Sequence, residues 1–213
     1  MENTLTDLLF EQYAVITKAL GSPQRIKILE MLAQHSCSVS ELASMCRLSH
    51  ANTSQHLQLL KRAHLIGFEN KGLQTIYHLH DEKIIDLLQL IKTLTNQVSA
   101  EFAQTRLRHF DSIDASKPIS MVKLVKKMRK HNVIICDARS KKEFEFAHIA
   151  GAIHESQIDE YVEPGNQELV VYGRSELCAL AYNVVARFNA LGYKTRKLEG
   201  GFPEWKRADY PIE

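Results

Sequence analysis

The period of the hydrophobic pattern changes near residue 118 of this 213-residue chain. From Leu5 to Phe110, apolar residues recur every three or four positions, which is the spacing of amphipathic helices. After Ile119, short apolar runs such as residues 133–136 alternate with helical segments, a pattern typical of a mainly parallel α/β sheet. We therefore expect two domains and a linker with these ranges: a mainly helical domain over 1–110, a linker over 111–118 and an α/β domain over 119–213.

The composition is that of an ordinary globular chain, with 45% hydrophobic residues, 24% charged residues and a formal net charge of +2. Because the charge is nearly balanced, a nucleic-acid site in such a chain must gather its basic groups locally. We expect a cytoplasmic protein without membrane contact, since no signal-peptide pattern and no membrane-spanning apolar run is found. The four cysteines lie far apart without a CxxC pair, so we expect no zinc site, no disulfide framework and no cofactor.

N-cap signals divide the first half of the chain into short helices. Ser22, Ser38 and Ser49 each precede an apolar-periodic segment, and Ser38 forms a capping box with Glu41. Residues 66–80 then predict a β-hairpin with a Lys-Gly turn. This order of elements, closed by a long helix, predicts a winged helix-turn-helix, in which the fourth helix is the DNA recognition helix.

The predicted recognition helix presents short polar side chains that suit DNA. Asn and Gln can read adenine through two hydrogen bonds, and Ser and His can reach phosphates or base edges. A lysine and a glutamine on the hairpin would contact the neighbouring backbone or the minor groove. The candidate DNA-binding residues are Ser49, His50, Asn52, Ser54, Gln55, His56, Lys71 and Gln74.

A narrow apolar seam of the coiled-coil type follows the hairpin, on a segment without proline or glycine from Asp81 to residue 117. The seam extends to Phe102, so the predicted helix is too long to pack only against its own small domain. We expect a dimer interface there, and a rigid spacer is the alternative. The seam residues are Ile84, Leu87, Ile91, Leu94 and Val98.

Three stretches of the first half, residues 19–32, 38–66 and 72–79, closely resemble the ArsR/SmtB family of dimeric bacterial repressors. The resemblance covers roughly residues 10–95. It implies a homodimeric repressor that binds a pseudo-palindromic operator in double-stranded DNA. It also implies dimerisation through the first and last helices of the domain, in agreement with the apolar seam.

Many members of that family sense metals, but their ligand patterns are absent from this sequence. Residues 38–40 are Ser-Val-Ser where a CxC pair is common, and the last helix lacks the DxH and HxxE pattern. Cys37 and Cys46 are isolated, and two separated thiols do not enclose a soft metal. His78 and His80 alternate on one strand face, and we interpret them as exposed hairpin histidines rather than ligands.

The second half resembles a single rhodanese domain over about residues 119–213, through Asp137-Ala138-Arg139, residues 148–152 and residues 200–205. In that family a cysteine ends the strand that corresponds to residues 170–172, and its thiolate carries sulfur as a persulfide. Here Gly173 stands at that position. The resemblance therefore implies a rhodanese-like shell that lacks its usual nucleophile.

The loop from Gly173 to Cys178 leaves three functions open. The preferred one is a degenerate enzyme whose loop (Gly173, Arg174, Ser175 and Cys178) binds a sulfur species or another small anion as an effector, without turnover. The second is a sulfurtransferase in which Cys178, at a helix N-terminus, is a relocated nucleophile. The third is a scaffold or dimer element. We expect Cys178 to lie at the far end of the loop from Gly173, and its plain alternative role is a small buried hydrophobe.

Overall fold

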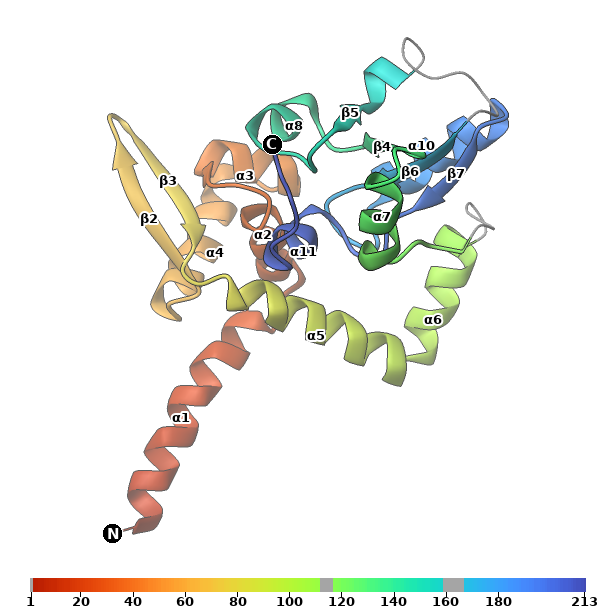
Figure 1. Ribbon diagram of the computed structural model, residues 1–213. Coiled ribbons are helices and arrows are strands. Elements are labelled where there is room, and N and C mark those ends of the chain that lie inside the picture. The colour runs from red at the N-terminus through yellow and green to blue at the C-terminus, as the bar shows by residue number, and fades with distance from the viewer. Residues whose placement is uncertain (1, 112–116, 159–166) are drawn as a thin grey trace. The chain divides into compact units, whose positions relative to one another are not determined.

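The computed structural model describes residues 2–111, 117–158 and 167–213. The chain divides into two compact units, Met1–Gln89 and Leu90–Glu213, which are described separately (Figure 1). The expected linker over 111–118 falls mainly on residues 112–116, which lie outside the described residues. Within the described part of the chain, no helix is both long enough and apolar enough to cross a membrane.

The first unit consists of helices and a small antiparallel sheet. The capping box forms as predicted, since the Ser38 hydroxyl accepts a hydrogen bond from the Glu41 amide and the Glu41 carboxylate accepts one from the Ser38 amide. The Ser49 hydroxyl likewise accepts from the Asn52 amide and starts the next helix. In chain order the elements are α1 (Glu2–Leu20), α2 (Pro23–Leu32), β1 (Cys37–Ser38), α3 (Val39–Cys46), α4 (His50–Arg62), β2 (Ile66–Lys71), β3 (Gln74–Leu79) and α5 (Lys83–Val98), which crosses into the second unit.

The hairpin of β2 and β3 is the predicted wing. Gly72, with φ +60°, makes the turn, a conformation that glycine adopts without strain. The sequence did not predict β1, which pairs with β3 through Cys37 and Tyr77 and gives the strand order β1-β3-β2. These elements confirm the predicted winged helix-turn-helix.

The long helix expected after the hairpin is interrupted at Ser99. There φ is −104° and ψ is 104°, and the Ser99 hydroxyl accepts a hydrogen bond from the Phe102 amide at 3.1 Å. This N-cap starts α6 (Ala100–Arg106), so the prediction of one helix with a seam reaching Phe102 was wrong. The cause is the strong preference of serine for N-cap positions, which acts without any proline or glycine.

The predicted seam has two different parts within α5. Ile84 is buried in the core of the first unit, as is Leu88, and Ile85 is buried too. The predicted seam did not include Ile85 and Leu88. By contrast, Leu94 is 49% exposed and Val98 is 80% exposed. From Leu90, which is 54% exposed, to Val98 the helix therefore leaves apolar side chains uncovered.

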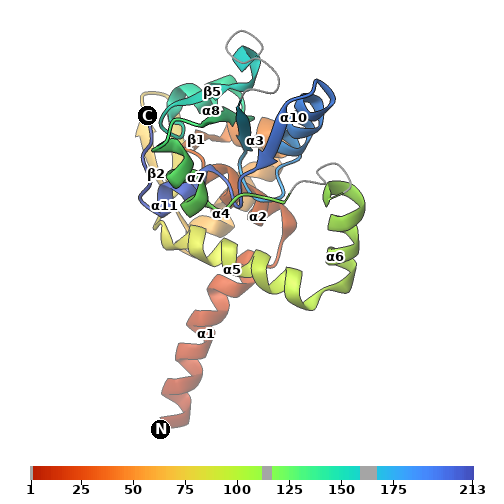
Figure 2. The same cartoon turned by 45° about the vertical axis from the view of Figure 1, so that its right-hand side comes forward.

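The second unit is built on a four-stranded sheet in which every pair of neighbouring strands is parallel, in the order β5-β4-β6-β7. One apolar cluster lies between the sheet and α10, and a second contains residues of α7 and α11 on the other face (Figure 2). This confirms the predicted α/β fold. After α6 its elements are η1 (Leu107–Asp111), α7 (Met121–Met128), β4 (Val133–Asp137), α8 (Lys141–Phe146), β5 (Ala152–His154), η2 (Glu155–Gln157), β6 (Glu168–Tyr172), α10 (Ala179–Ala190), β7 (Lys194–Lys197) and α11 (Phe202–Arg207).

Candidate functional site

The α4 helix is held rigidly by one buried face. Thr53, Leu57 and Leu60 are each 0% exposed, and both leucines belong to the core that includes Ile28 and Leu42. The Thr53 hydroxyl also donates a hydrogen bond to the Ser49 carbonyl at 2.9 Å. Because the apolar contacts and the N-cap fix the rotation of α4 about its axis, its opposite face has a defined orientation.

Gln55 is exposed on that opposite face, and Asn52 and Ser54 are half-buried on its flanks. His50 is exposed in the first turn of the helix, seven positions before the buried Leu57, and so lies at the helix N-terminus rather than on the opposite face. Ser49 is exposed at the helix N-terminus, where its oxygen caps the helix and its hydroxyl hydrogen can still be donated. The structure therefore groups these polar side chains around one end of α4.

Sequence reasoning missed two residues of the same surface. Gln58 and Arg62 follow Gln55 by three and seven positions, and both are exposed. Side chains at this spacing lie on one side of a helix, so the helical period measured from Gln55 would have found them. Arg62 adds a cation that can bind phosphate.

His56 differs from the other candidates because its ring is partly withdrawn from solvent. Its Nδ1 is buried and has no hydrogen-bond partner among the described residues. Burial, together with the positive charge of Arg25 on α2, lowers the pKa of the imidazole. The lowered pKa favours the neutral ring of His56, and a neutral imidazole forms no charge-assisted hydrogen bond with a phosphate.

The wing presents its predicted residues at an exposed tip. Gln74 is exposed, and Lys71 Nζ lies 2.7 Å from Glu69 Oε1 in an exposed ion pair. This pair lowers the pKa of Glu69. His78 is half-buried, and a Cβ at Gly67 on the facing strand would overlap its ring.

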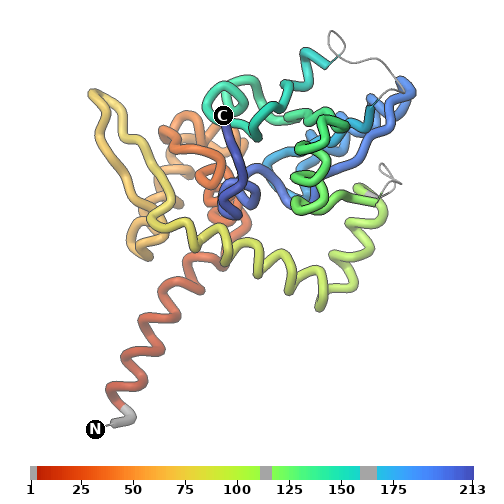
Figure 3. Tube along the Cα trace, viewed as in Figure 1, coloured from red at the N-terminus to blue at the C-terminus, as the bar shows by residue number. Residues whose placement is uncertain are grey.

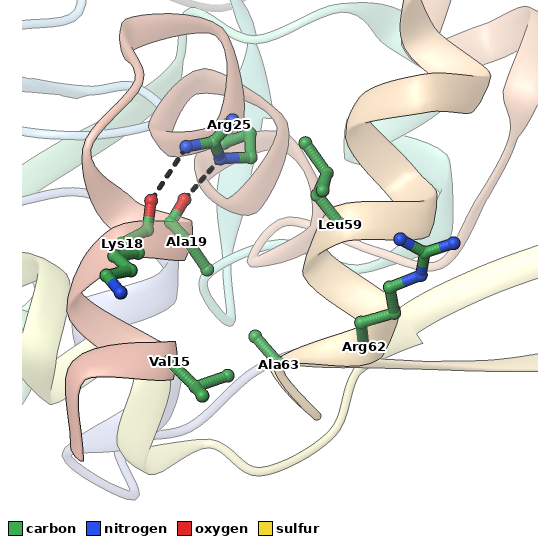
Figure 4. Close-up of a pocket in the computed structure, with 7 residues that line it drawn as sticks. All are labelled: Val15, Lys18, Ala19, Arg25, Leu59, Arg62 and Ala63. Carbon is green, nitrogen blue, oxygen red and sulfur yellow. Dashed lines mark hydrogen bonds between the residues drawn. The ribbon is translucent and has the colours of Figure 1, made fainter. Parts of the chain in front are cut away.

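Helix α1 extends away from α2 to α4 of its own unit (Figure 3). It exposes a long apolar surface. Seven large apolar residues between Leu5 and Ile16 are at least 40% exposed. At the C-terminal end of α1, a pocket of about 220 Å³ continues this surface towards α4 (Figure 4). Arg25 bounds the pocket and donates hydrogen bonds to the Lys18 and Ala19 carbonyls. The pocket is lined by Val15, Lys18, Ala19, Arg25, Leu59, Arg62 and Ala63.

In the second unit, the candidate loop begins at Gly173, directly after β6. The Cys178 sulfur lies over this glycine, because a Cβ at Gly173 would be only 2.6 Å from Cys178 Sγ and 3.1 Å from Ala181 Cβ. The expectation that Cys178 lies at the far end of the loop from Gly173 was therefore wrong. Cys178 is 8% exposed and belongs to the apolar cluster beneath α10. Glycine at 173 gives its side chain room to fold inward.

The other side of the loop is packed against a glycine pair. A Cβ at Gly201 would lie 2.5 Å from the Ser175 nitrogen, and the Phe202 amide donates to the Gly173 carbonyl at 3.0 Å. Gly200, with φ +80°, turns the chain into this contact. The loop backbone is thus held from both sides.

Arg174 points its charge at α8. Its Nε and Nη2 donate to the two carboxylate oxygens of Glu143, each at 2.7 Å. Glu143 is 1% exposed and also accepts from the Ser140 amide and hydroxyl in the capping box of α8. Although burial opposes ionisation, the hydrogen bond and charge of Arg174 lower the pKa of Glu143 to about 2. The Arg174 guanidinium, which the sequence analysis assigned to a bound anion, is therefore already paired with the Glu143 carboxylate.

A buried polar network supports the ends of β4 and β6 below this loop. Arg139 donates to both carboxylate oxygens of Asp137, and the Tyr172 hydroxyl donates to Asp137 as well. The Arg139 guanidinium lies 3.9 Å from the centre of the Phe202 ring, and burial raises the pKa of the Tyr172 hydroxyl. Asp137 and Arg139 carried the resemblance in the sequence, but nothing there indicated Tyr172 as their partner.

Comparison with known proteins agrees with this two-unit fold. Residues 22–66 match the bacterial regulatory protein, arsR family, and residues 120–208 match the rhodanese-like domain. The arsenical resistance operon repressor of Bacillus subtilis is 34% identical over 89 residues, which are 41% of this chain and 84% of that protein. The chain belongs to the ArsR family. It is a transcriptional regulator of that family with a C-terminal rhodanese-like domain, as the sequence predicted.

A relative of similar length is similar to this chain over nearly its whole length. The HTH-type transcriptional regulator Rv0324 of Mycobacterium tuberculosis is 26% identical over 209 residues, which cover 96% of this chain and 92% of that protein. Among solved structures, the crystal structure of M. tuberculosis Rv0081 has 32% identity and a TM-score of 0.41, and the match covers 45% of this chain and 96% of that chain.

Proposed function

We propose that this ArsR-family regulator is a homodimeric repressor that binds a pseudo-palindromic operator in double-stranded DNA through α4 and the wing. The observation that carries the proposal is the polar face of α4, which the buried Thr53, Leu57 and Leu60 hold in one orientation. Recognition helices need such a fixed face because base readout depends on hydrogen-bond geometry.

Positive charge gathers around this face, as a nearly neutral chain requires. Arg47, Arg62 and Lys71 are exposed at the end of α3, the end of α4 and the tip of the wing. Each can bind a phosphate oxygen and so set the position of α4 on the duplex. The polar residues Gln55 and Asn52 would then supply the base contacts.

The exposed apolar surface of α1 supports the dimer. Isolated exposed leucines need no explanation, but a continuous apolar helix face marks an interaction surface. A twofold dimer suits DNA reading because it places two copies of α4 on successive major-groove faces of the duplex. The pocket beside Leu59 and Val15 extends this surface and offers space for an apolar side chain of the second copy.

We expect Gln55→Ala combined with His50→Ala to abolish the preference for operator DNA over a scrambled duplex. Each lost base contact costs about 1–3 kcal/mol, so a dimer with four removed side chains should lose at least about 100-fold in specific affinity. Fluorescence anisotropy with the DNA upstream of the gene measures this change.

The matched control is Gln97→Ala, which removes an exposed amide from α5 and should leave operator affinity within about twofold. Light scattering must show both variants as dimers. If the α4 variant still prefers operator DNA over the scrambled duplex as strongly as the natural chain does, α4 is not the recognition helix.

The second unit is proposed to be non-catalytic and to respond to a sulfur species or another small anion at the loop from Gly173 to Cys178. The start of α10 supports this, since Cys178 is its N-cap and makes no side-chain capping bond, so backbone amides there remain for an acceptor. Because Arg174 is held by Glu143, these amides rather than its guanidinium would bind the anion.

Sulfur transfer through Cys178 is the second candidate function. One observation favours it: Cys178 Sγ lies beside the position at which a nucleophile at residue 173 would begin. Its 8% exposure opposes it, because a persulfide-forming thiolate must be reached by its donor. We expect no thiosulfate:cyanide sulfurtransferase turnover above the protein-free rate. Robust turnover that disappears in Cys178→Ser would establish the enzyme instead.

A further inference from the structure

Helix α7 and the turn that follows it concentrate the positive charge of the chain. Residues 117–136 contain six Lys and Arg residues and no Asp or Glu. The rest of the chain contains the other 21 of the 27 basic residues and all 25 acidic residues. This stretch therefore carries a formal charge of +6, and the rest of the chain carries −4. The six residues are Lys117, Lys123, Lys126, Lys127, Arg129 and Lys130.

The fold places most of this charge on one exposed surface. Leu124 is 0% exposed, and Met121, Val125 and Met128 lie against the same core, so the rotation of the helix is fixed. Val122 is the exposed apolar residue of this helix. The Lys130 amide donates to the Lys127 carbonyl at 3.0 Å, which continues the helical turn past Met128. We call the resulting exposed set the basic surface; it consists of Lys123, Lys126, Arg129 and Lys130.

Neighbouring carboxylates do not neutralise the basic surface. Glu168 is the nearby acid, but Lys127 Nζ approaches it to 2.6 Å and Arg196 approaches it to 3.6 Å. Among the residues that the structure describes, no carboxylate forms an ion pair with the four members of the basic surface. Their charge is therefore available to an external anion.

We propose that the basic surface binds the phosphate backbone of DNA that flanks the operator. The inference rests on the proposed function, because α4 must first hold the duplex. Lys123, Lys126 and Lys130 recur at three- and seven-residue spacing along one side of the helix and span roughly 10 Å. Duplex DNA carries one negative charge per about 1.7 Å of its axis, so such a row meets several phosphates.

Covalent connection makes DNA the favoured partner of this surface. Once α4 binds its site, the second unit of the same chain is confined near that duplex, and short tethers give effective concentrations in the millimolar range. Phosphate contacts that are weak in isolation then add to the binding of the whole chain. Such contacts need no base sequence and tolerate a range of orientations, as four flexible lysine and arginine side chains allow.

The test compares the salt dependence of DNA binding by three full-length proteins: the natural chain, Lys123→Gln/Lys126→Gln/Lys130→Gln, and a matched control. The control, Lys141→Gln/Lys142→Gln/Lys206→Gln, removes the same charge from exposed positions of α8 and α11. The probe is a labelled duplex with the operator and about two helical turns of flanking DNA on each side. Anisotropy titrations between about 50 and 200 mM salt give the slope of log K against log salt.

The basic-surface variant should bind with a slope that is shallower by about 0.9 for each lost phosphate contact, up to about five for a dimer. Its preference for operator over scrambled DNA should persist, because phosphate contacts carry no sequence information. The control should keep the natural slope. If the basic-surface variant binds the operator specifically with the slope of the natural chain, this inference alone is overturned, and an acidic protein remains as the partner of the surface. An equal decrease of the slope in the basic-surface variant and the control also overturns it. Absence of any specific binding by the natural chain overturns the proposed function as well.

Discussion

A chain that carries Leu9→Glu and Leu94→Glu is expected to sediment as a folded monomer. Leu9 is 52% exposed and Leu94 is 49% exposed in the single chain, so a carboxylate at either position remains hydrated and leaves the fold intact. At a dimer interface each carboxylate would lose its water without gaining a partner. Burying an unpaired charge costs several kcal/mol, and a twofold dimer contains four of them. The dissociation constant should therefore rise by at least about 1,000-fold, as sedimentation equilibrium measures.

The control places one such charge on α5, away from the side that carries Leu94. Asn96→Glu alters an exposed polar position and should leave the dimer unchanged. A dimer that persists in the Leu9 and Leu94 variant would show that neither helix forms the interface. A monomeric control would show that net charge, rather than the apolar surface, governs assembly.

Replacing Gly173 by alanine is expected to destabilise the protein by about 1–3 kcal/mol, the usual cost of overpacking a filled site. The physical reason is the Cys178 sulfur, which would lie 2.6 Å from the new Cβ. Cys178→Gly removes the two side-chain atoms that lie under 3.0 Å from the new Cβ, while Ala181 Cβ remains at 3.1 Å. Glycine is tolerated at an N-cap. The double variant should therefore lose less stability than the sum of the two single changes.

Urea unfolding of the four proteins gives the coupling free energy between the two positions. We expect a coupling free energy of at least about 1 kcal/mol, with the double variant more stable than the sum of the two single effects predicts. Additive effects within about 0.5 kcal/mol would show that the Cys178 side chain does not occupy the space over Gly173. For the same reason, Gly173→Cys alone should not restore sulfur transfer, because the new thiol has no space until Cys178 is removed.

The sequence predicted the features that depend on short-range chemistry. The capping box of Ser38 with Glu41 and the N-cap at Ser49 involve residues at most three positions apart, and both form. The buried face of α4 follows from apolar spacing alone. Ser99 belongs to the same class, and its N-cap preference would have predicted the end of α5 had it been weighed against the continuous seam.

Long-range pairings could not be read from the sequence. Arg174 meets Glu143 from 31 residues away, and no periodicity connects them. The position of Cys178 depends on the absence of a side chain at Gly173, a steric effect that becomes visible only when both are placed. His56 was assigned to the outward face by its type, whereas partial burial and, after it, the charge of Arg25 lower the pKa of its ring.

A DNase footprint of the natural chain on the DNA upstream of its own gene, at about 0.15 M salt, tests the central claim most directly. A dimer that reads DNA through α4 should protect two half-sites whose centres lie about one helical turn apart. Protection should vanish with Gln55→Ala and His50→Ala, while that variant stays dimeric. Uniform cleavage along the fragment, by a protein shown to be a folded dimer, would contradict the assignment of this chain as a DNA-reading repressor.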